Sequence, residues 1–308
     1  MDCTICNGTG WKSVDGGVAR CDCWRANITE KLLGDSRIPP RYLRCQLENF
    51  VVYPNEKLQN ALAQARRFVN AFPAVPKGLC LIGPPGIGKT HIAAAVLRQV
   101  ILEKHARGLF YDVRDLLRII RSTYNPVVRT AEMDILRPVM EADVLVLDDL
   151  GAEKPSEWVE ETMNLIVNTR YNEKRPTIFT TNYLDIPDEA DLDSLKVRVG
   201  FRMHSRLHEM CEFLEYDGGD FRMLPPNSGP QDLSDLWQMN KGRRVLPTRT
   251  RGPARAQIGG ATLSGGAHQA ERPSAMAEQG TERARREREQ RLRDPRDLKW
   301  PGGKAGRG

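Results

Sequence analysis

One stretch of the chain, residues 78–90, limits the possible folds more than any other. It reads GLCLIGPPGIGKT, in which an apolar run from Leu79 to Ile82 leads into the pattern G-x-x-x-x-G-K-T. The following residues, THIAAAVLRQVI, are typical of a helix. The glycines let backbone N–H groups turn toward an anion, and the start of the helix adds its positive dipole end. Strand, glycine-rich turn and helix in this order predict a phosphate-binding loop.

The polar residues at the end of this loop have separate expected roles. Lys89 is expected to reach the outer phosphates of a nucleotide, and the Thr90 hydroxyl is expected to ligate Mg²⁺. The alternative is a chance match in a glycine turn, which the strand and the helix on either side make rare. The predicted ATP site is formed by Gly83, Pro84, Pro85, Gly86, Ile87, Gly88, Lys89 and Thr90.

A second apolar run, from Val144 to Leu147, ends in two consecutive acids. Such a run is typical of a central parallel strand that is buried on both faces. Because the carboxyl ends of parallel strands lie beside the phosphate loop, Asp148 is expected to hold the Mg²⁺ shell and Asp149 to polarise the attacking water. Two acids at a strand end are common by chance, but downstream of a phosphate loop they indicate an ATPase.

A third strand is expected over 177–181, after a helix over 157–171, and it ends at Asn182. An amide at this strand end could bridge the acids and the γ-phosphate and orient the attacking water. The alternative is an ordinary turn asparagine.

Four cysteines stand close together at the start of the chain. A C-x-x-C pair is followed, after a loop with a DGG hairpin turn, by a C-x-C pair. Four thiolates with this spacing can close a tetrahedral Zn²⁺ site, and a segment this short needs a metal to fold. A disulfide pair or a redox C-x-x-C are the alternatives. The predicted zinc ligands are Cys3, Cys6, Cys21 and Cys23.

Composition sets limits on where the protein acts. The 308 residues are 40% hydrophobic, and no apolar run approaches the length that a bilayer requires. Met1 leads directly into polar residues and cysteines, unlike a signal peptide. Seven cysteines, four of them before residue 24, suit a reducing compartment. We expect a soluble, cytoplasmic protein without a membrane segment.

Positive charge is concentrated at the carboxyl end. The net charge is +6, but residues 241–308 alone hold 17 Lys/Arg and 7 Asp/Glu. This tail is rich in Gly, Pro and Arg and is expected to be disordered, apart from a possible charged helix at TERARREREQRLR. It could bind DNA phosphates or an acidic partner, or only keep the protein soluble.

These patterns predict a domain organisation in four parts. A zinc module occupies residues 1–25, and a linker with a docking surface occupies 26–54. The ATPase core spans 55–224 and opens with a helix over 55–72. A truncated lid remnant and the basic tail make up 225–308.

Two sets of arginines are placed at helical spacing. The first set follows a strand expected over 109–113, and it forms either a solvated basic face or a DNA-contacting face. The second set is expected to lie on one face of a single helix. The first set is Arg114, Arg118 and Arg121, and the second is Arg198, Arg202 and Arg206.

Several strings occur in order and together resemble the DnaC/DnaI-type replicative helicase loaders, AAA+ ATPases that share a domain with the transposition helper IstB. They are the early C-x-x-C-x-G-x-G, IPPRYLRCQLENF, GPPGIGKTHIAAA, VLVLDDLG, RYNEKRPTIFTTN and GFRMHSRLHEM. The resemblance runs from Met1 to Arg222 and implies an α/β P-loop core with a five-stranded parallel sheet. It matches Asn182 to sensor 1, Arg206 to the arginine finger and Arg222 to sensor 2.

The same resemblance implies that the amino-terminal module grips the helicase and that the ATPase domain binds single-stranded DNA. An arginine finger further implies a site shared between neighbouring subunits. Three functions remain open from the sequence. They are an ATP-dependent helicase loader, an IstB-like transposition helper, and an adaptor that binds ATP with little turnover.

Overall fold

Five parallel strands form the central sheet, in the spatial order β4-β5-β6-β3-β7. The computed structural model describes residues 3–125, 131–186, 193–225 and 228–240. The predicted five-stranded parallel sheet is confirmed. Its strands are β3 (Gly78–Ile82), β4 (Gly108–Asp112), β5 (Val144–Asp148), β6 (Thr177–Thr181) and β7 (Cys211–Glu215).

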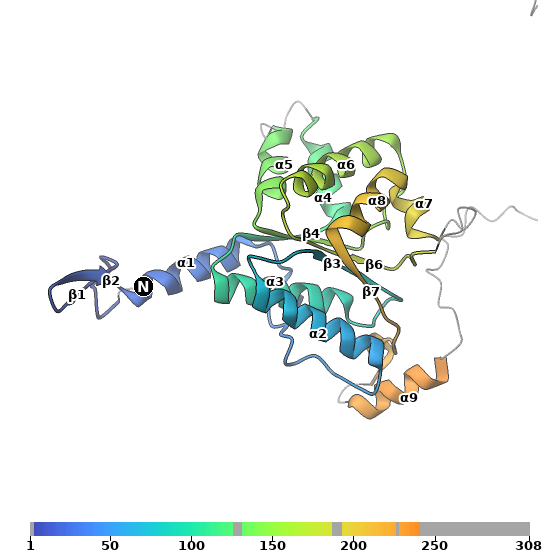
Figure 1. Cartoon of the computed structure of the whole chain (residues 1–308), viewed down its shortest axis with the longest axis horizontal. Helices are drawn as coiled ribbons and strands as arrows, with labels where there is room; N and C mark the ends of the chain where they lie inside the picture. Colours follow the sequence, from blue (N-terminus) through green and yellow to red (C-terminus); the bar gives the residue numbers. More distant parts are fainter. Residues whose placement is uncertain (1–2, 126–130, 187–192, 226–227, 241–308) are drawn as a thin grey trace, which may run out of the picture. The chain divides into compact units, whose positions relative to one another are not determined.

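Helices cover both faces of the sheet, which gives three layers and confirms the predicted α/β fold (Figure 1). Side chains alternate across β3. Leu79 and Leu81 join one apolar core, whereas Cys80 and Ile82 join the other. The first core includes α2 (Glu56–Ala71) and α3 (Lys89–Lys104), and the second includes α4 (Val113–Ser122), α5 (Glu132–Glu141), α6 (Glu157–Asn172) and α8 (Phe201–Met210).

The second set of arginines does not lie on one helix, so that prediction is wrong. Gly200 has φ +83° and ψ 152°, which ends α7 (Leu195–Val199) before α8 begins. A Cβ at Gly200 would also lie 3.1 Å from the carboxylate of Glu160. Arg198 therefore belongs to α7 and donates a hydrogen bond to the Tyr183 hydroxyl, while the other two arginines are on α8.

The segment between the cysteines and α2 is partly built into the core. It begins with α1 (Asp22–Asp35) and contains a short 3-10 turn, Pro40–Tyr42. Beyond α1 it contributes buried side chains to the apolar core on the side of α2 and α3. These are Ile38, Cys45, Leu47 and Tyr53.

The amino-terminal module contains the expected hairpin. Strands β1 (Trp11–Val14) and β2 (Gly17–Arg20) pair antiparallel, with Val14 opposite Gly17 across the two-residue turn. Gly16 in that turn has φ +88°, a conformation that glycine adopts without steric cost.

At the other end of the core, a 3-10 turn, Phe221–Met223, precedes a single helix, α9 (Pro230–Asn240). Leu233 of this helix is buried in the core. The predicted tail and its charged helix lie outside the described residues. Among the helices that the structure describes, none is both long enough and apolar enough to cross a membrane.

Arg170 of α6 is fully buried and joins two parts of the core. Its guanidinium donates to the carbonyl oxygens of Val139, Met140 and Ala142 at the end of α5, at 2.9–3.1 Å. It also donates to the Pro176 carbonyl and the Thr177 hydroxyl at the start of β6, at 2.7 and 2.8 Å. Burial lowers the pKa of this guanidinium, because removing its charge from water costs free energy. The hydrogen bonds to the surrounding oxygen atoms offset that cost.

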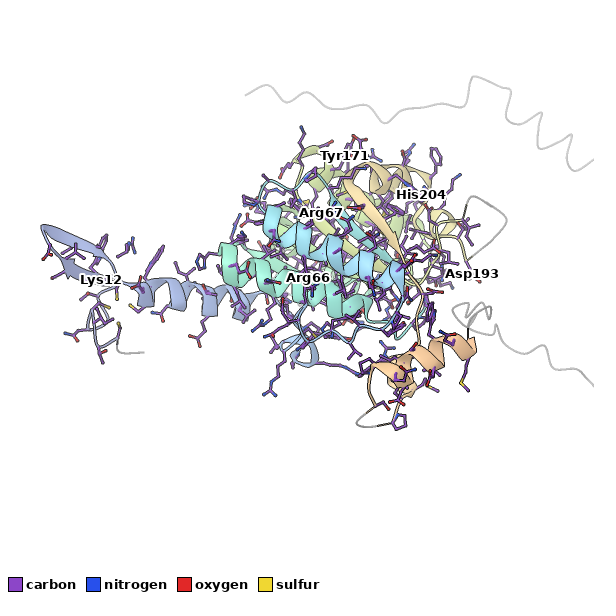
Figure 2. All side chains as sticks on the ribbon, turned by 60° about the horizontal axis from the view of Figure 1, so that its bottom comes forward. Lys12, Arg66, Arg67, Tyr171, Asp193 and His204 are labelled. Carbon is purple, nitrogen blue, oxygen red and sulfur yellow. The ribbon has the colours of Figure 1, made fainter. Side chains whose placement is uncertain are left out.

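We expect Arg170→Lys to lower the free energy of unfolding by about 3 kcal/mol, because lysine has fewer donors and each buried acceptor left unpaired costs about 1–3 kcal/mol. Urea unfolding measures the change. Arg66→Lys, at an exposed position of α2 labelled in Figure 2, is the matched control and should change stability by less than about 0.5 kcal/mol. Equal losses in both variants would contradict a structural role for Arg170.

Candidate nucleotide site and cysteine cluster

A cavity of about 570 Å³ opens at the carboxyl ends of β3, β5 and β6. Its volume suits a nucleotide-sized ligand, and its position is where open α/β sheets bind ligands. The phosphate loop and three residues predicted separately from it meet in this cavity. Those three are Asp148, Asp149 and Asn182.

Neighbouring side chains occupy the space that a side chain would need at two of the loop glycines. Gly86 has φ +82° and Gly88 has φ +95°. A Cβ at Gly88 would lie 2.5 Å from the Phe50 ring, and one at Gly86 would lie 1.7 Å from a carboxylate oxygen of Asp220. Glycine is therefore required at both positions for this loop conformation.

Lys89 lies buried inside the loop. Its ammonium donates to the carbonyl oxygens of Gly83 and Pro84, at 2.8 and 2.7 Å, and to the amide oxygen of Asn182 at 2.8 Å. Burial lowers the pKa of Lys89 to about 8, despite the opposing attraction of Asp148 and Asp149. A buried cation that hydrogen-bonds only neutral oxygens fits an anionic phosphate.

Asp148 connects the loop to two strands. Thr90 donates its hydroxyl to both carboxylate oxygens, at 3.0 and 3.2 Å, and Thr180 of β6 donates at 2.6 Å. Burial raises the pKa of Asp148, although these two hydroxyls act in the opposite direction. A hydroxyl beside a carboxylate is the hard oxygen donor set that Mg²⁺ prefers, so these residues fit that ion.

Asp149 has an unusual backbone and three polar partners. Its φ is +61°, which is uncommon for a residue other than glycine. Its N–H donates to the Thr180 hydroxyl at 2.9 Å, and its carboxylate accepts from the Asn182 amide at 2.7 Å. The Arg114 guanidinium pairs with the same carboxylate at 3.1 Å. Asn182 thus bridges Lys89 and Asp149.

Arg114 was predicted only as part of a basic helix face, and its place in the site was missed. It pairs with Asp112 as well as with Asp149. The sequence indicated only that Asp112 ends a parallel strand at the ligand edge of the sheet, whereas the contact with Asp149 depends on β4 lying beside β5. The other members of that face lie elsewhere, since Arg118 pairs with Asp115 and Arg121 lies over the Trp158 ring.

An aromatic wall of the cavity was also missed. Phe50 and Tyr53, from the segment predicted to be a linker, line the cavity together with Leu233 of α9. His91 meets the Phe50 ring edge-on at 5.2 Å, and Trp237 of α9 packs on Tyr53 at 5.8 Å. Apolar and aromatic surface beside a phosphate loop suits a nucleotide base.

The two arginines matched by the resemblance lie in different places. Arg222 lines the cavity, near the phosphate loop. Arg206, on α8, does not line it, and its guanidinium donates to the Arg202 carbonyl of its own helix at 3.0 Å. Glu209, a possible surface partner of Arg206, instead accepts from Tyr171 at 2.7 Å. Within the described part of the chain, Arg206 forms no ion pair with Glu209 or Glu212.

The four predicted zinc ligands come together in the amino-terminal module, whose sulfur atoms are yellow in Figure 2 near the labelled Lys12. All four sulfurs lie within 4.8 Å of one another, and all are free thiols. The Sγ atoms of Cys3 and Cys21 are 3.7 Å apart, and those of Cys6 and Cys23 are 3.2 Å apart. Tetrahedral zinc with bonds of about 2.3 Å needs sulfurs about 3.8 Å apart, so the cluster fits this ion after a small expansion.

The hydrogen bond between Cys6 and Cys23 moves their pKa values in opposite directions, raising that of Cys23 and favouring the thiolate of Cys6. The hydrogen bond from Cys23 lowers the pKa of Cys6, and the Gly10 N–H, 3.4 Å from the same sulfur, acts in the same direction. A thiolate is the form that binds metal.

The sheet order, the loop and the paired acids together define a P-loop protein of the α/β class. The family pattern described as "IstB-like ATP binding protein" matches residues 59–222, which is more than half of the chain. This chain belongs to that family of ATP-binding proteins. The predicted relation to DnaC-type AAA+ ATPases is confirmed.

Individual relatives agree with this assignment. The chain is 30% identical over 200 residues to the "Replicative helicase loader DnaC" of Escherichia coli, covering 64% of this chain and 78% of that protein. It is 28% identical over 183 residues to the protein of the same name from Buchnera aphidicola subsp. Baizongia pistaciae, covering 59% and 71%. The solved structure titled "Crystal structure of the DnaC helicase loader" aligns with a TM-score of 0.51 and 35% identity, covering 57% of this chain and 99% of that one.

The depressed pKa of Lys89 predicts proton uptake when nucleotide binds. An adjacent polyphosphate stabilises the charged ammonium and raises its pKa from about 8 toward the ordinary lysine value. Binding should therefore take up about half a proton per site at pH 8 and very little at pH 6. Calorimetric titration with a non-hydrolysable Mg-ATP analogue, in two buffers of different ionisation enthalpy, measures this number.

The exposed Lys57→Met variant is the control for this titration and should keep the uptake. A binding heat at pH 8 that is the same in both buffers would show that Lys89 is already fully charged in the free protein.

Proposed function

We propose that this protein is an ATP-dependent loader of a replicative DNA helicase. One observation carries the proposal. The loop lysine, the two acids and the Asn182 amide meet in one cavity, in a chain that resembles named helicase loaders over 200 residues. Free thiols are typical of a reducing compartment, and a helicase loader acts on DNA, so we expect the protein to act in the cytoplasm.

Nucleotide and metal would be held by different parts of the cavity. The loop from Gly83 to Thr90 and the Lys89 ammonium would bind the phosphates, with Arg222 at the cavity wall near them. Thr90 and Asp148 would hold Mg²⁺, which when bound neutralises charge on the phosphates. The aromatic wall at Phe50 and Tyr53 would take the base.

Hydrolysis would depend on Asp149 and Asn182. Asp149 would accept a proton from the attacking water. The Asn182 amide, which donates a hydrogen bond to the Asp149 carboxylate, would fix the orientation of that carboxylate. The ion pair from Arg114 holds the other carboxylate oxygen. Asp149 is therefore the residue on which turnover, rather than binding, is expected to depend.

Arg206 would complete the site of a neighbouring subunit. Arg206 lies outside the cavity of its own chain. Among the described residues, its guanidinium forms no ion pair with an acidic side chain and donates only to the carbonyl of Arg202. A guanidinium from the next protomer would stabilise charge in the transition state, an effect worth about 10³ to 10⁵ in rate. A head-to-tail contact of this kind produces a ring or an open spiral of this chain.

Mixing inactive variants tests this arrangement. Arg206→Ala and Lys89→Ala should each lose ATPase activity, and an equimolar mixture should recover part of it, because some interfaces then combine an intact loop with an intact arginine. Steady-state phosphate release measures the recovery.

The matched control mixes Lys89→Ala with Asp149→Asn, which damage the same side of the interface and should recover nothing. Asp149→Asn alone should bind ATP but fail to hydrolyse it, and turnover at the parent rate would refute its role as base. Full activity of Arg206→Ala alone would refute the finger.

The amino-terminal module would bind the helicase. Zn²⁺ held by the four cysteines would supply the folding energy that this small segment lacks. Five large apolar side chains on it remain exposed to solvent, and the most exposed are Val18 at 70%, Ile5 at 65% and Trp11 at 47%. Arg20 lies between the Trp11 and Trp24 rings, at 4.6 and 4.5 Å, and holds both in place. Exposed apolar groups on a rigid support suit a protein partner.

We expect Cys21→Ser to release the zinc and to abolish capture of the helicase, while ATP binding survives because the cavity contains no cysteine from this cluster. Metal analysis should find about one zinc per chain fewer in Cys21→Ser than in the parent. Cys80→Ser, a buried core cysteine, controls for loss of a thiol alone.

A pull-down with the parent and with Cys21→Ser, from cells of the organism that produces this protein, identifies the partner. A hexameric helicase lost by Cys21→Ser supports the loader, whereas a transposase in its place would establish the transposition helper. A zinc-free parent that captures the helicase normally would refute the role of the module. Single-stranded DNA binding by the ATPase core is tested by titrating the parent with labelled oligonucleotide.

A further inference from the structure

A second group of metal-ligating side chains lies outside both sites described above. Asp185 follows β6, and His204 and His208 stand four residues apart on α8, so that they share one face of the helix. The candidate ligand atoms of all three lie within 4.8 Å of one another. Each histidine meets a different oxygen of the one carboxylate, through Nε2 of His204 at 2.6 Å and Nε2 of His208 at 3.0 Å.

The chemistry of this group suits a transition metal. Two histidines at i and i+4 on a helix, joined by a carboxylate, are a donor set that Zn²⁺ uses, with a fourth position left to water. Ligand atoms about 2.0–2.1 Å from a tetrahedral ion lie about 3.3–3.4 Å apart. The separation between His208 and Asp185 would need to open by about 0.3 Å, and that between His204 and Asp185 by about 0.7 Å.

The rings are held in place by neighbours that are not ligands. His208 stacks on Phe213 of β7 at 4.1 Å with an interplanar angle of 11°, and His204 meets the same ring edge-on at 6.5 Å. His204, labelled in Figure 2, is mostly buried, whereas the side chain of His208 is 47% exposed. An ion can therefore reach the group from solvent on the His208 side.

We propose that Asp185, His204 and His208 bind one divalent transition-metal ion, Zn²⁺ foremost, independently of the four cysteines. The ion would join the segment after β6 to α8. Asp185 lies three residues beyond Asn182, and Arg206 stands between the two histidines in sequence. One metal would thus fix the distance between the strand end that carries the amide and the helix that carries the arginine.

Cobalt titration of the full chain tests the proposal, because Co²⁺ reports its ligands. The cysteine site gives an intense thiolate-to-cobalt charge-transfer band, whereas a His₂Asp site gives only weak visible bands. We expect about two ions per chain, the second adding visible absorption without further charge transfer, and Zn²⁺ should displace both. His208→Asn should bind only the first ion, and Asp185→Asn should behave in the same way.

His105→Asn is the matched control, since it removes a histidine at a left-handed position that asparagine tolerates, and it should keep both ions. In chelator, His208→Asn should melt like the parent, which shows that it folds. Added Zn²⁺ should then raise the melting temperature of the Cys21→Ser variant but not that of Cys21→Ser combined with His208→Asn. A parent that binds one cobalt, or a second cobalt that persists in His208→Asn, would overturn the proposal and leave a metal-free histidine–carboxylate pair.

Discussion

The site depends on a single half-buried carboxylate, that of Asp148. Asp148 accepts hydrogen bonds from Thr90 of the phosphate loop and from Thr180 of the neighbouring strand. A carboxylate taken out of water is costly unless it is hydrogen-bonded or ligates a metal, and this burial already raises its pKa. The two hydroxyls satisfy it only in part. The phosphate loop, β5 and β6 are therefore held together around a group that a divalent cation would stabilise further.

The elements that the sequence predicted well are those with a local signal. Strand, glycine turn and helix at residues 78–104 are adjacent in the chain, and the runs ending at Asp148 and Asn182 are short and fully apolar or β-rich. The contacts that were missed connect distant residues. Arg114 reaches Asp149 only because β4 lies next to β5, and that strand order is a tertiary result that no spacing encodes.

Gly200 shows the opposite case. The glycine was a local sign of a helix end, but the prediction followed the periodic spacing of the arginines instead. The i, i+4, i+8 spacing of the arginines describes a continuous helix, yet the backbone at Gly200 is outside the helical region and packs against Glu160. The prediction for residues 26–54 also missed part of the structure. Its charged pattern predicted a linker, while Leu47 and Tyr53 are buried and Phe50 closes over the loop glycine.

The hydrogen bonds of Arg170 determine which elements of the protein unfold together. One side chain of α6 satisfies the last carbonyls of α5 and the first residues of β6, so none of these elements can separate without exposing buried acceptors. Amide hydrogens from the end of α5 to the start of β6 should accordingly exchange as one cooperative unit rather than fraying piece by piece. Since β6 also carries Thr180 and leads into Asn182, a local unfolding event in this unit would dismantle the nucleotide site while β3 and β7 remain paired.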